Sequence, residues 1–434
     1  MKTVIMAGGR GTRISAITSD IPKPLIKIEG KSVLEHEIAC LRECGFTEII
    51  LTVSHLANQI IGHFGSGKKF GVNIDYFVEE RPLGNAGALF KLGLENDFLL
   101  LNADVLFNVD FSRLVNYHRA KGGLATLFTH PNSHPYDSGI IVADTDAAVV
   151  DWLTKESPKP RWYANRVNAG LHVINPAVLA MTGIAPEIIG TEIDGKVVKV
   201  DLDRQVLRPL CNTGKMFCYD SPEYVRDMGT PDRYQAVCRD FASGCVEAKS
   251  LRNRQRAIFL DRDGTINKYV GFLQNVDQFE LLTGVTEAIK KINASGYLAI
   301  LVTNQPVIAR GELTVSGLRE IHNKMETLLG AGGAYLDAIY YCPHHPHKGY
   351  AGEVMDLKID CECRKPKPGM LLRAAEKFNI DLSASWMIGD SESDIKAGKA
   401  AECRTALIGT EDFGQDKTVG SLLDFVDFLF HSRR

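Results

Sequence analysis

The stretch IFLDRDGTIN, residues 258–267, decides the fold of the C-terminal part of the chain. An apolar run leads directly into Asp261 and Asp263, and Gly264 and Thr265 follow them. A buried strand that ends in carboxylates places them at the carboxyl edge of a parallel sheet, where α/β folds hold their chemistry. Asp261 is suited to attack a phosphorus atom, and Asp263 to manage the proton of the leaving group. A polar strand end that leads into a turn is an equally good interpretation of these residues alone.

Length and composition limit the classes of protein to consider. A chain of 434 residues exceeds one typical domain and predicts about two or three. The 45% hydrophobic and 24% charged residues are typical of a globular protein. The formal net charge is -3, and Lys and Arg are spread along the chain, so we expect no nucleic-acid partner.

The start of the chain and its cysteines indicate a compartment. MKTVIMAGGRGTR (1–13) turns polar after six residues, so we expect no signal peptide. No apolar run approaches the roughly 20 residues of a membrane span, so we expect no membrane association. The chain has ten cysteines, and without a secretory signal these predict reduced thiols in the cytoplasm.

Two series of apolar runs predict an α/β fold with two Rossmann-like domains. The first domain is expected over 1–240, with strands at 3–7, 48–54, 75–80, 98–104, 125–129 and 170–175. Ser32 and Glu35 form a capping box for a helix that ends at Gly45. Residues 241–256 are polar and are expected to form a linker. The second domain is expected over 257–434, with strands at 257–261, 297–304, 338–342, 386–390 and 405–409. Helical patterns between the strands of this second series imply a parallel sheet with helices on its faces.

Three further motifs follow strands of the second series or precede a helix. TNQ closes the 297–304 strand, GDSESD (389–394) closes the next, and RKPKPG (364–369) precedes a helix. Thr303 and Asn304 are suited to hold phosphoryl oxygens, and Lys365 to neutralise their charge. Asp261, Asp390 and Asp394 offer the hard oxygen ligands that Mg²⁺ prefers. Each motif alone is a weak signal, but these three together with DRDGT (261–265) indicate a phosphate-transfer site.

With these motifs, residues 257–409 resemble the haloacid dehalogenase-like phosphatases. The resemblance implies that Asp261 forms an aspartyl-phosphate. It makes Asp263 the general acid and base, with a backbone carbonyl that also touches Mg²⁺. About 40 residues separate Asp263 from Thr303, and about 60 separate Asn304 from Lys365. Neither gap holds a cap domain, so we expect a capless site that is open to a small, extended substrate.

The second gap contains a candidate zinc site. Cys342 and His344 form one close pair, and Cys361 and Cys363 form another. Three thiolates and one imidazole complete a tetrahedral Zn²⁺ shell without a position for water, which is typical of a structural site. The alternative is a cysteine at a strand end beside a histidine-rich loop. His345 and His347 are expected to lie outside the shell.

This loop resembles that of the heptose-1,7-bisphosphate 7-phosphatases, a group within the same family. The resemblance implies that Arg310, Arg364 and Lys365 bind substrate. Histidinol-phosphate phosphatases carry a similar zinc loop, so the loop alone does not select the substrate. The family commonly reads TNQSGIARG where this chain has Pro306 and Val307 after TNQ, and this departure affects the expected substrate preference.

Five motifs lie in order in the N-terminal part of the chain. They are MAGGRGTR (6–13), IPKPLI (21–26), PLGNAGAL (82–89), NAD (102–104) and MGTP (228–231). The first follows a strand, so its glycines expose backbone N–H groups where a helix begins, which predicts a phosphate cradle. Lys23 stands between two prolines, a stiff mount for a cation.

These five motifs resemble those of the sugar-1-phosphate nucleotidyltransferases across about 1–235, which implies a GT-A-like sheet. Asn85 replaces the usual threonine of the third motif, and Ala103 stands where Gly is common. The resemblance implies that Lys23 stabilises the α-phosphate and that Mg²⁺ is held by two aspartates. It implies triphosphate, base and sugar contacts by the remaining residues. The triphosphate residues are Gly8, Gly9, Gly11 and Arg13, the metal ligands are Asp104 and Asp227, the base and sugar pocket has Gly84 and Gly87, and the sugar-phosphate contacts are Gly139, Asn168, Gly170 and Lys199.

Each resemblance narrows the substrates that we expect for the other part of the chain. A heptose bisphosphate phosphatase releases a sugar 1-phosphate, which a nucleotidyltransferase can activate. Together they imply heptose-1-phosphate guanylyltransfer from GTP, in synthesis of GDP-heptose for lipopolysaccharide or S-layer glycans. The alternative keeps both chemistries with another sugar 1-phosphate or NTP and a different phosphatase, such as one like the histidinol phosphatases. A regulatory protein with a degenerate domain would lack catalytic groups, and here they are present. Base, anomer, oligomeric state and domain orientation stay open.

Overall fold

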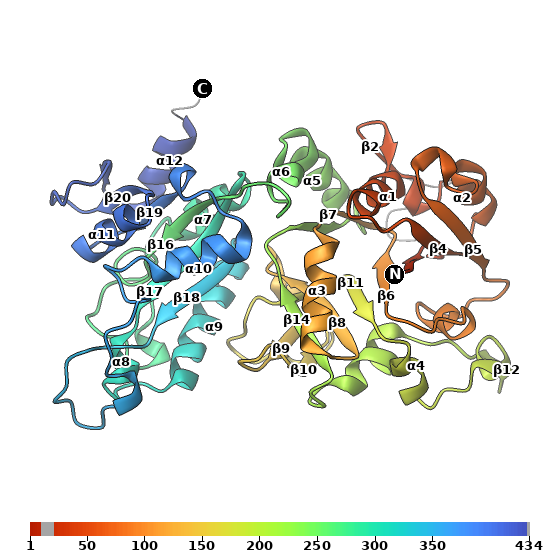
Figure 1. Cartoon of the computed structure of the whole chain (residues 1–434), viewed down its shortest axis with the longest axis horizontal. Coiled ribbons are helices and arrows are strands. Elements are labelled where there is room, and N and C mark those ends of the chain that lie inside the picture. Colours follow the sequence, from red (N-terminus) through yellow and green to blue (C-terminus); the bar gives the residue numbers. More distant parts are fainter. Residues whose placement is uncertain (10–20, 432–434) are drawn as a thin grey trace. The chain divides into compact units, whose positions relative to one another are not determined.

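The computed structural model describes residues 1–9 and 21–431 of the chain (Figure 1). The chain divides into two compact units. The first consists of Met1–His130, Ile141–Leu153 and Asn168–Ser250, and the second of Pro131–Ile140, Thr154–Val167 and Leu251–Arg434. Each unit has its own central sheet.

A nine-stranded mixed sheet forms the centre of the N-terminal part. Strand β1 (Thr3–Met6) pairs in parallel with β4 (Glu48–Val53) and β6 (Phe98–Asn102). β5 (Asn73–Val78) extends the parallel set beyond β4, whereas β11 (Val167–Ile174) pairs with β6 in the antiparallel sense. The other strands are β8 (Ala125–His130), β9 (Ile140–Ala143), β10 (Val149–Leu153) and β14 (Met216–Asp220). The phosphate-cradle motif therefore begins where the central strand β1 ends.

Local sequence explains the first long helix, α1 (Val33–Glu43). The Ser32 side chain accepts from the Glu35 backbone N–H, and the Glu35 carboxylate accepts from the Ser32 N–H, which confirms the predicted capping box. Gly45 follows the helix with φ +82°, a conformation in which glycine is favoured at a helix end. The other helices are α2 (Ala57–Phe64), α3 (Phe111–Lys121), α4 (Ala177–Met181), α5 (Pro231–Ala242) and α6 (Cys245–Ala248).

Both faces of this sheet are buried, which accounts for the nearly continuous apolar runs of its strands. Ile5, Leu99 and Leu101 pack into one cluster, and Val4 and Leu100 into the other. Short strands complete this part of the chain. They are β2 (Lys27–Ile28), β3 (Lys31–Ser32), β7 (Val105–Asn108), β12 (Glu192–Ile193), β13 (Lys196–Val197) and β15 (Tyr224–Asp227).

The second unit contains a six-stranded parallel sheet in the order β18-β17-β16-β19-β20-β21. Its strands are β16 (Arg256–Leu260), β17 (Tyr297–Asn304), β18 (Ala338–Cys342), β19 (Trp386–Gly389), β20 (Arg404–Ile408) and β21 (Lys417–Val419). Its helices are α7 (Val285–Asn293), α8 (Pro306–Ala309), α9 (Val315–Ala331), α10 (Gly369–Phe378), α11 (Glu392–Ala400) and α12 (Leu422–His431). The sheet has a buried cluster on each face, one containing Ile258 and Leu260, the other Ala257 and Phe259.

The predicted α/β architecture, with one large sheet in each part of the chain, is confirmed. The strands expected at 297–304 and 338–342 have the predicted bounds, and the others are within a few residues of them. No helix among the described residues is long and apolar enough to cross a membrane.

Candidate functional sites

The carboxyl ends of three neighbouring strands bring the phosphatase motifs together. β16 lies between β17 and β19, and Leu260 is level with Leu301 and Ile388 in the two neighbours. Because the strands are parallel, the residues that follow them emerge at one edge. Asp261 follows β16, Thr303 and Asn304 end β17, and Asp390 follows β19. The parallel sheet thus accounts for the convergence predicted from the sequence.

Lys365 connects the carboxylates at this edge. Its Nζ lies 2.6 Å from Asp261 Oδ1 and 2.6 Å from Asp394 Oδ1. It also donates to the Val302 carbonyl oxygen at 2.8 Å, and only 3% of the residue is exposed. Asp394 is fully buried, and its other oxygen accepts from the Ser391 hydroxyl at 2.6 Å. The ammonium group is therefore fixed directly beside the predicted nucleophile.

The charges at this edge fit a divalent cation. Oxygens of Asp261, Asp390 and Asp394 lie within 4.8 Å of one another, and Lys365 supplies one compensating charge. Burial raises the pKa of Asp261 to about 7, although Lys365 opposes the rise. Burial and the neighbouring Asp394 raise the pKa of Asp390 to about 6. Excess negative charge in a buried oxygen cluster is the setting in which Mg²⁺ binds.

Gly264 makes room for one of these carboxylates. It has φ +87°, and a Cβ atom built on it would lie 1.9 Å from Asp390 Oδ2. Any side chain would therefore have to displace the Asp390 carboxylate. The glycine after DRD is explained both by its backbone conformation and by this close approach.

The Asp263 carboxylate has different partners. Arg262 donates to both of its oxygens, at 3.0 and 2.8 Å from the same terminal nitrogen. Gln305 donates to Oδ2 at 3.0 Å, and Asn267 donates to Oδ1 at 3.1 Å. Asp263 does not belong to the cluster of metal-ligand oxygens, so only its backbone carbonyl stays as the expected Mg²⁺ contact.

Thr303 and Asn304 differ in what they can offer to a phosphate. The Thr303 hydroxyl oxygen accepts from Gln305 Nε2 at 2.9 Å, which leaves the hydroxyl proton for another acceptor. The Asn304 amide binds the backbone of Lys365 at both ends, donating to its carbonyl at 2.9 Å and accepting from its N–H at 3.0 Å. In the structure the Asn304 side chain thus holds Lys365, and its expected phosphate contact stays a prediction.

The two predicted substrate arginines are held by the loop that carries the candidate zinc ligands. The Arg310 guanidinium lies 4.2 Å from the Phe272 ring centroid and 4.7 Å from that of Tyr350. One Arg310 nitrogen is 3.3 Å from His345 Nε2, and Arg364 donates to the His344 carbonyl oxygen at 3.3 Å. The structure accounts for their positions, while contact with substrate stays a prediction.

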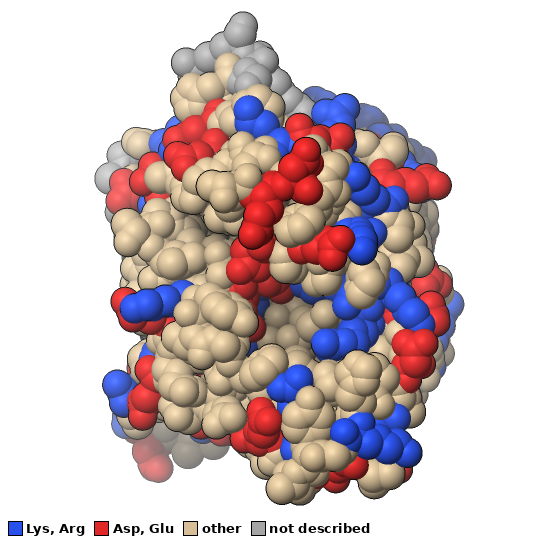
Figure 2. Space-filling view, turned by 90° about the vertical axis from the view of Figure 1, so that its left-hand side faces the viewer, with Lys and Arg blue, Asp and Glu red and all other residues tan. Residues whose placement is uncertain are grey.

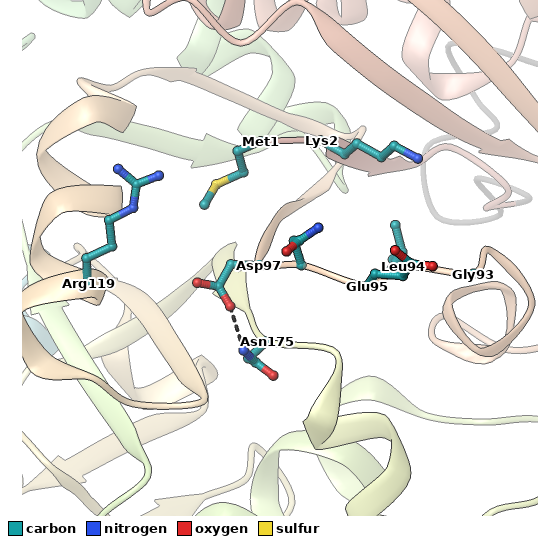
Figure 3. Close-up of a pocket in the computed structure, with 9 residues that line it drawn as sticks. Met1, Lys2, Gly93, Leu94, Glu95, Asp97, Arg119 and Asn175 are labelled. Carbon is teal, nitrogen blue, oxygen red and sulfur yellow. Dashed lines mark hydrogen bonds between the residues drawn. The ribbon is translucent and has the colours of Figure 1, made fainter.

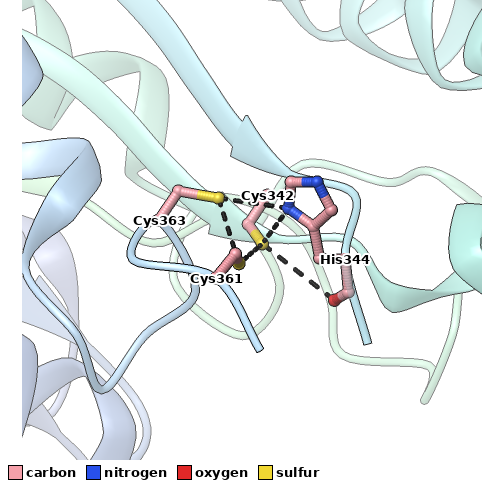
Figure 4. A group of neighbouring side chains, drawn as sticks. All are labelled: Cys342, His344, Cys361 and Cys363. Carbon is pink, nitrogen blue, oxygen red and sulfur yellow. Dashed lines mark hydrogen bonds between the residues drawn. The ribbon is translucent and has the colours of Figure 1, made fainter. Parts of the chain in front are cut away.

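Figure 4 shows Cys342, His344, Cys361 and Cys363 converging on one point. The Cys342–Cys361 and Cys361–Cys363 sulfurs are 3.5 and 3.3 Å apart. His344 Nδ1 is 3.6 Å from the Cys342 sulfur and 3.3 Å from that of Cys363. A tetrahedral zinc shell has ligand–ligand edges of about 3.7 Å, so the four side chains fit a closed metal site. His345 and His347 do not belong to this group of metal-ligand side chains.

The candidate transferase site lies where β6 and η2 (Lys23–Leu25) meet. Lys23 Nζ is 3.0 Å from Asp104 Oδ2, and Asp104 follows β6 by two residues. β15 pairs with β7 so that Asp227 is level with Val105. The sheet therefore brings the two predicted metal ligands close along neighbouring strands. In the structure one Arg233 nitrogen donates to both Asp227 oxygens, at 2.8 and 3.0 Å.

A buried carboxyl group lies behind Asp104. Glu37 on α1 is fully buried, and burial followed by the negative charge of Asp104 raises its pKa well above the ordinary range. A neutral Glu37 avoids adding a further negative charge beside the predicted metal ligand. The sequence shows Glu37 only as one residue of an amphipathic helix, and its electrostatic interaction with Asp104 depends on the fold.

The glycine motifs are partly described. Gly8 and Gly9 follow β1 after one intervening residue, Ala7, whereas Gly11 and Arg13 lie outside the described residues. Gly84 has φ +85°, and a Cβ there would lie 2.3 Å from the Val200 carbonyl oxygen. A Cβ on Gly87 would lie 2.7 Å from the Leu83 Cβ. Packing alone thus requires glycine at 84 and 87, and their nucleotide contacts stay predictions.

Two of the four predicted sugar-phosphate residues share one strand. Asn168 Oδ1 accepts from the Gly170 N–H at 3.2 Å and lies 3.1 Å from His172 Nε2. A Cβ on Gly170 would lie 2.3 Å from Asn102 Nδ2, so this strand approaches the Asp104 turn closely. Lys199 is exposed, and Gly139 belongs to the second compact unit. Their roles stay predictions.

A cavity of about 780 Å³ lies at the amino ends of β1 and β6, away from all these motifs. Lys2, Asp97 and Arg119 line it, and Asn175 donates to Asp97 Oδ1 at 2.7 Å (Figure 3). Elsewhere, Figure 2 shows acidic and basic side chains interspersed around a hollow on one face. That mixture agrees with the small net charge of the chain.

Sequence reasoning missed several residues of these sites. Arg262, Asn267 and Gln305 hold Asp263, and Arg233 holds Asp227. One signal was available for Arg262, because a charged residue inside a buried strand end requires a partner. The other contacts have no local signal in the sequence.

The two sites define an enzyme with two centres for phosphate chemistry. A model of the nucleotidyl transferase family matches residues 2–242, and a HAD-hydrolase-like model matches residues 362–422. The D-glycero-beta-D-manno-heptose-1,7-bisphosphate 7-phosphatase of Pasteurella multocida (strain Pm70) is 45% identical over 154 residues, 36% of this chain and 81% of that protein. The protein of that description from Escherichia coli (strain K12) is 43% identical over 152 residues, 35% of this chain and 78% of that protein. The chain therefore belongs to the nucleotidyl transferase family through its N-terminal part and to the family of these phosphatases through its C-terminal part.

Two solved structures are also similar to parts of the chain. HddC from Yersinia pseudotuberculosis shares 23% identity with a TM-score of 0.45, covering 55% of this chain and 99% of that one. The D,D-heptose 1.7-bisphosphate phosphatase from B. bronchiseptica, complexed with magnesium and phosphate, shares 30% identity with a TM-score of 0.36. That match covers 41% of this chain and 99% of that one.

Proposed function

We propose that the chain makes a nucleotide-activated heptose in two steps. The C-terminal part removes the 7-phosphate of D-glycero-D-manno-heptose 1,7-bisphosphate. The N-terminal part then transfers GMP from GTP to heptose 1-phosphate and releases pyrophosphate. The observation that carries the proposal is the Lys365–Asp261–Asp394 cluster, in a part of the chain that is 45% identical to a phosphatase of that substrate.

In the first step an Asp261 oxygen attacks the phosphorus of the 7-phosphate. The bond between phosphorus and the sugar oxygen breaks, and Asp263 gives its proton to that oxygen. Lys365 neutralises charge on the phosphoryl group, and the Thr303 hydroxyl donates to one of its oxygens. Asp263 then takes a proton from the water that hydrolyses the aspartyl-phosphate. Asp261, Asp390 and Asp394 would hold Mg²⁺, which when bound offsets the repulsion between carboxylate and phosphate.

Substrate selection at this site is assigned to the loop around the four metal-binding side chains. Cys342, His344, Cys361 and Cys363 would hold Zn²⁺, which when bound stabilises the loop without taking part in the reaction. Arg310 and Arg364 lie on or against this loop and would bind the second phosphate of the sugar. The proposed site is capless, because the stretches between Asp263 and Thr303 and between Asn304 and Lys365 are too short to hold a cap domain.

In the second step no protein nucleophile is needed. The sugar phosphate attacks the α-phosphorus of GTP in line, and pyrophosphate leaves. Lys23 stabilises the α-phosphate, Asp104 and Asp227 would hold Mg²⁺, and the motif MAGGRGTR (6–13) binds the triphosphate. The Lys23–Asp104 and Arg233–Asp227 pairs support these roles, because they hold the two carboxylates in place. Selection of guanine, the sugar-phosphate contacts and the boundaries 1–240, 241–256 and 257–434 belong to the proposal. So does a cytoplasmic location without nucleic-acid or membrane partners.

One incubation tests both steps. The protein is mixed with Mg²⁺, heptose 1,7-bisphosphate and each NTP in turn, and phosphate and pyrophosphate are measured. We expect phosphate in every mixture and pyrophosphate only with GTP. Pyrophosphate with UTP or CTP but not with GTP would contradict guanylyltransfer. A protein that releases no phosphate from the bisphosphate would contradict the first step.

A further inference from the structure

A fully buried arginine lies between the two aspartates of the phosphatase motif. Arg262 follows Asp261 directly and has no exposed surface. A buried guanidinium is costly unless its charge and its donors are satisfied. Within the described ranges, the carboxylate that pairs with Arg262 is that of Asp263, at 2.8 Å. The position of the Arg262 guanidinium therefore depends on Asp263, the predicted general acid and base.

Arg262 contacts Asp263 along one side of its carboxylate. A terminal nitrogen donates to Oδ2 at 2.8 Å and to Oδ1 at 3.0 Å, and Nε also donates to Oδ1, at 3.2 Å. A planar guanidinium with several donors fixes both the direction and the plane of a carboxylate. The ammonium of a lysine is a point charge and fixes neither.

Two neutral side chains fix Arg262 in turn. The Gln305 amide oxygen accepts from Arg262 at 2.9 Å, so its amide nitrogen faces Asp263 and Thr303. His322 on α9 lies 3.5 Å from another Arg262 nitrogen. Burial and the charge of Arg262 lower the pKa of His322 to about 3, so the imidazole is neutral and accepts the bond. The guanidinium is thereby held from three sides.

We propose that Arg262 is the positioning residue of the phosphatase reaction, which holds the Asp263 carboxyl group in the direction of the leaving oxygen. The proposal rests on the proposed role of Asp263. When Asp261 bonds to phosphorus, the electron pair of the broken bond passes to the leaving oxygen, which takes the proton of Asp263. The neutral amide bonds from Asn267 and Gln305 open for this transfer. The charge-assisted bonds from Arg262 persist, because bonds of this kind are the stronger ones.

The test uses two leaving groups with Arg262→Met in the full-length protein. An alkoxide leaving group requires the proton of Asp263, whereas p-nitrophenolate leaves without one. We expect kcat/KM for heptose 1,7-bisphosphate to fall by about 10²-fold, within the range of general acid catalysis. For p-nitrophenyl phosphate we expect a loss of less than about tenfold, since kcat/KM there reports only the attack by Asp261.

Two further variants make the result decisive. Arg262→Lys keeps the positive charge but loses the planar guanidinium with its several donors. We therefore expect an intermediate loss that is again larger for the sugar phosphate. This variant also serves if Arg262→Met does not fold, as judged by circular dichroism. Arg319→Met, at an exposed position of α9, should leave both substrates unchanged. Equal losses for both substrates, or complete rescue by lysine, would overturn the positioning role. A wild-type protein without phosphatase activity would instead overturn the proposed function.

Discussion

Replacing Gly264 by alanine should separate phosphatase activity from stability. The new Cβ would lie 1.9 Å from Asp390 Oδ2, and ordinary contact begins at 3.4 Å, so the carboxylate must retreat by about 1.5 Å. A misplacement of about 1 Å at a reaction centre costs on the order of 10²-fold in rate. The left-handed backbone at φ +87° adds a cost of about 1 to 2 kcal/mol in the free energy of unfolding.

Gly333→Ala is the matched control. Gly333 has φ +81°, but the nearest of its neighbours would lie 3.6 Å from the new Cβ. Both variants should lose about 1 to 2 kcal/mol in urea denaturation. Only Gly264→Ala should lose about 10²-fold in kcat for phosphate release and require more Mg²⁺, while pyrophosphate release from heptose 1-phosphate and GTP stays unchanged. A phosphatase kcat within about fivefold of wild type in Gly264→Ala would refute this reading of the Asp390 site.

Three other changes test further parts of the structure. Lys365→Met should lower the phosphatase kcat by about 10³-fold, as for other lost electrostatic contacts. The nearby Lys367→Met, which removes pairs with exposed carboxylates, should change kcat less than about twofold; a similar loss in both would contradict the role of Lys365. Cys361→Ser should reduce bound zinc from about one equivalent to less than about 0.1 by metal analysis, because a closed shell loses a ligand; retained zinc would contradict that shell. Burial and the charge of Arg262 depress the pKa of His322 to about 3 in the folded protein, from its ordinary value of 6.5. The free energy of unfolding therefore falls as the pH drops below 6.5, by about 2 kcal/mol between pH 7 and 5. His322→Gln should remove that loss in urea denaturation, and an unchanged pH dependence would contradict a buried neutral imidazole.

Much of the fold follows from local sequence. The apolar runs at 297–304 and 338–342 are bounded by polar or turn residues, so their ends coincide with β17 and β18. The capping box at Ser32 and Glu35 places the start of α1 in the same way. The short strands β7 and β15 lack such a signal, because they gain their pattern only by pairing with each other.

The site was predictable only where motifs end strands. Asp261 and Asp390 meet because β16 and β19 are parallel neighbours. The apolar runs implied the parallel sheet but not the order of its strands. Lys365 reaches Asp261 across 104 residues of sequence, and a motif can suggest this contact but not its geometry. The use of the Asn304 amide to hold the Lys365 backbone depends on the path of a loop. Side-chain hydrogen bonds of this kind carry no periodicity, so the sequence does not predict them.

Two variants of one protein test most directly that a single chain carries two independent centres. With heptose 1,7-bisphosphate, GTP and Mg²⁺, the wild type should release phosphate and pyrophosphate. Asp261→Asn should release neither, yet should form pyrophosphate when heptose 1-phosphate is supplied. Lys23→Met should release phosphate alone, and mixing the two variants should restore pyrophosphate formation. Loss of both activities in either folded variant, or pyrophosphate formation by Asp261→Asn directly from the bisphosphate, would contradict the two-step account.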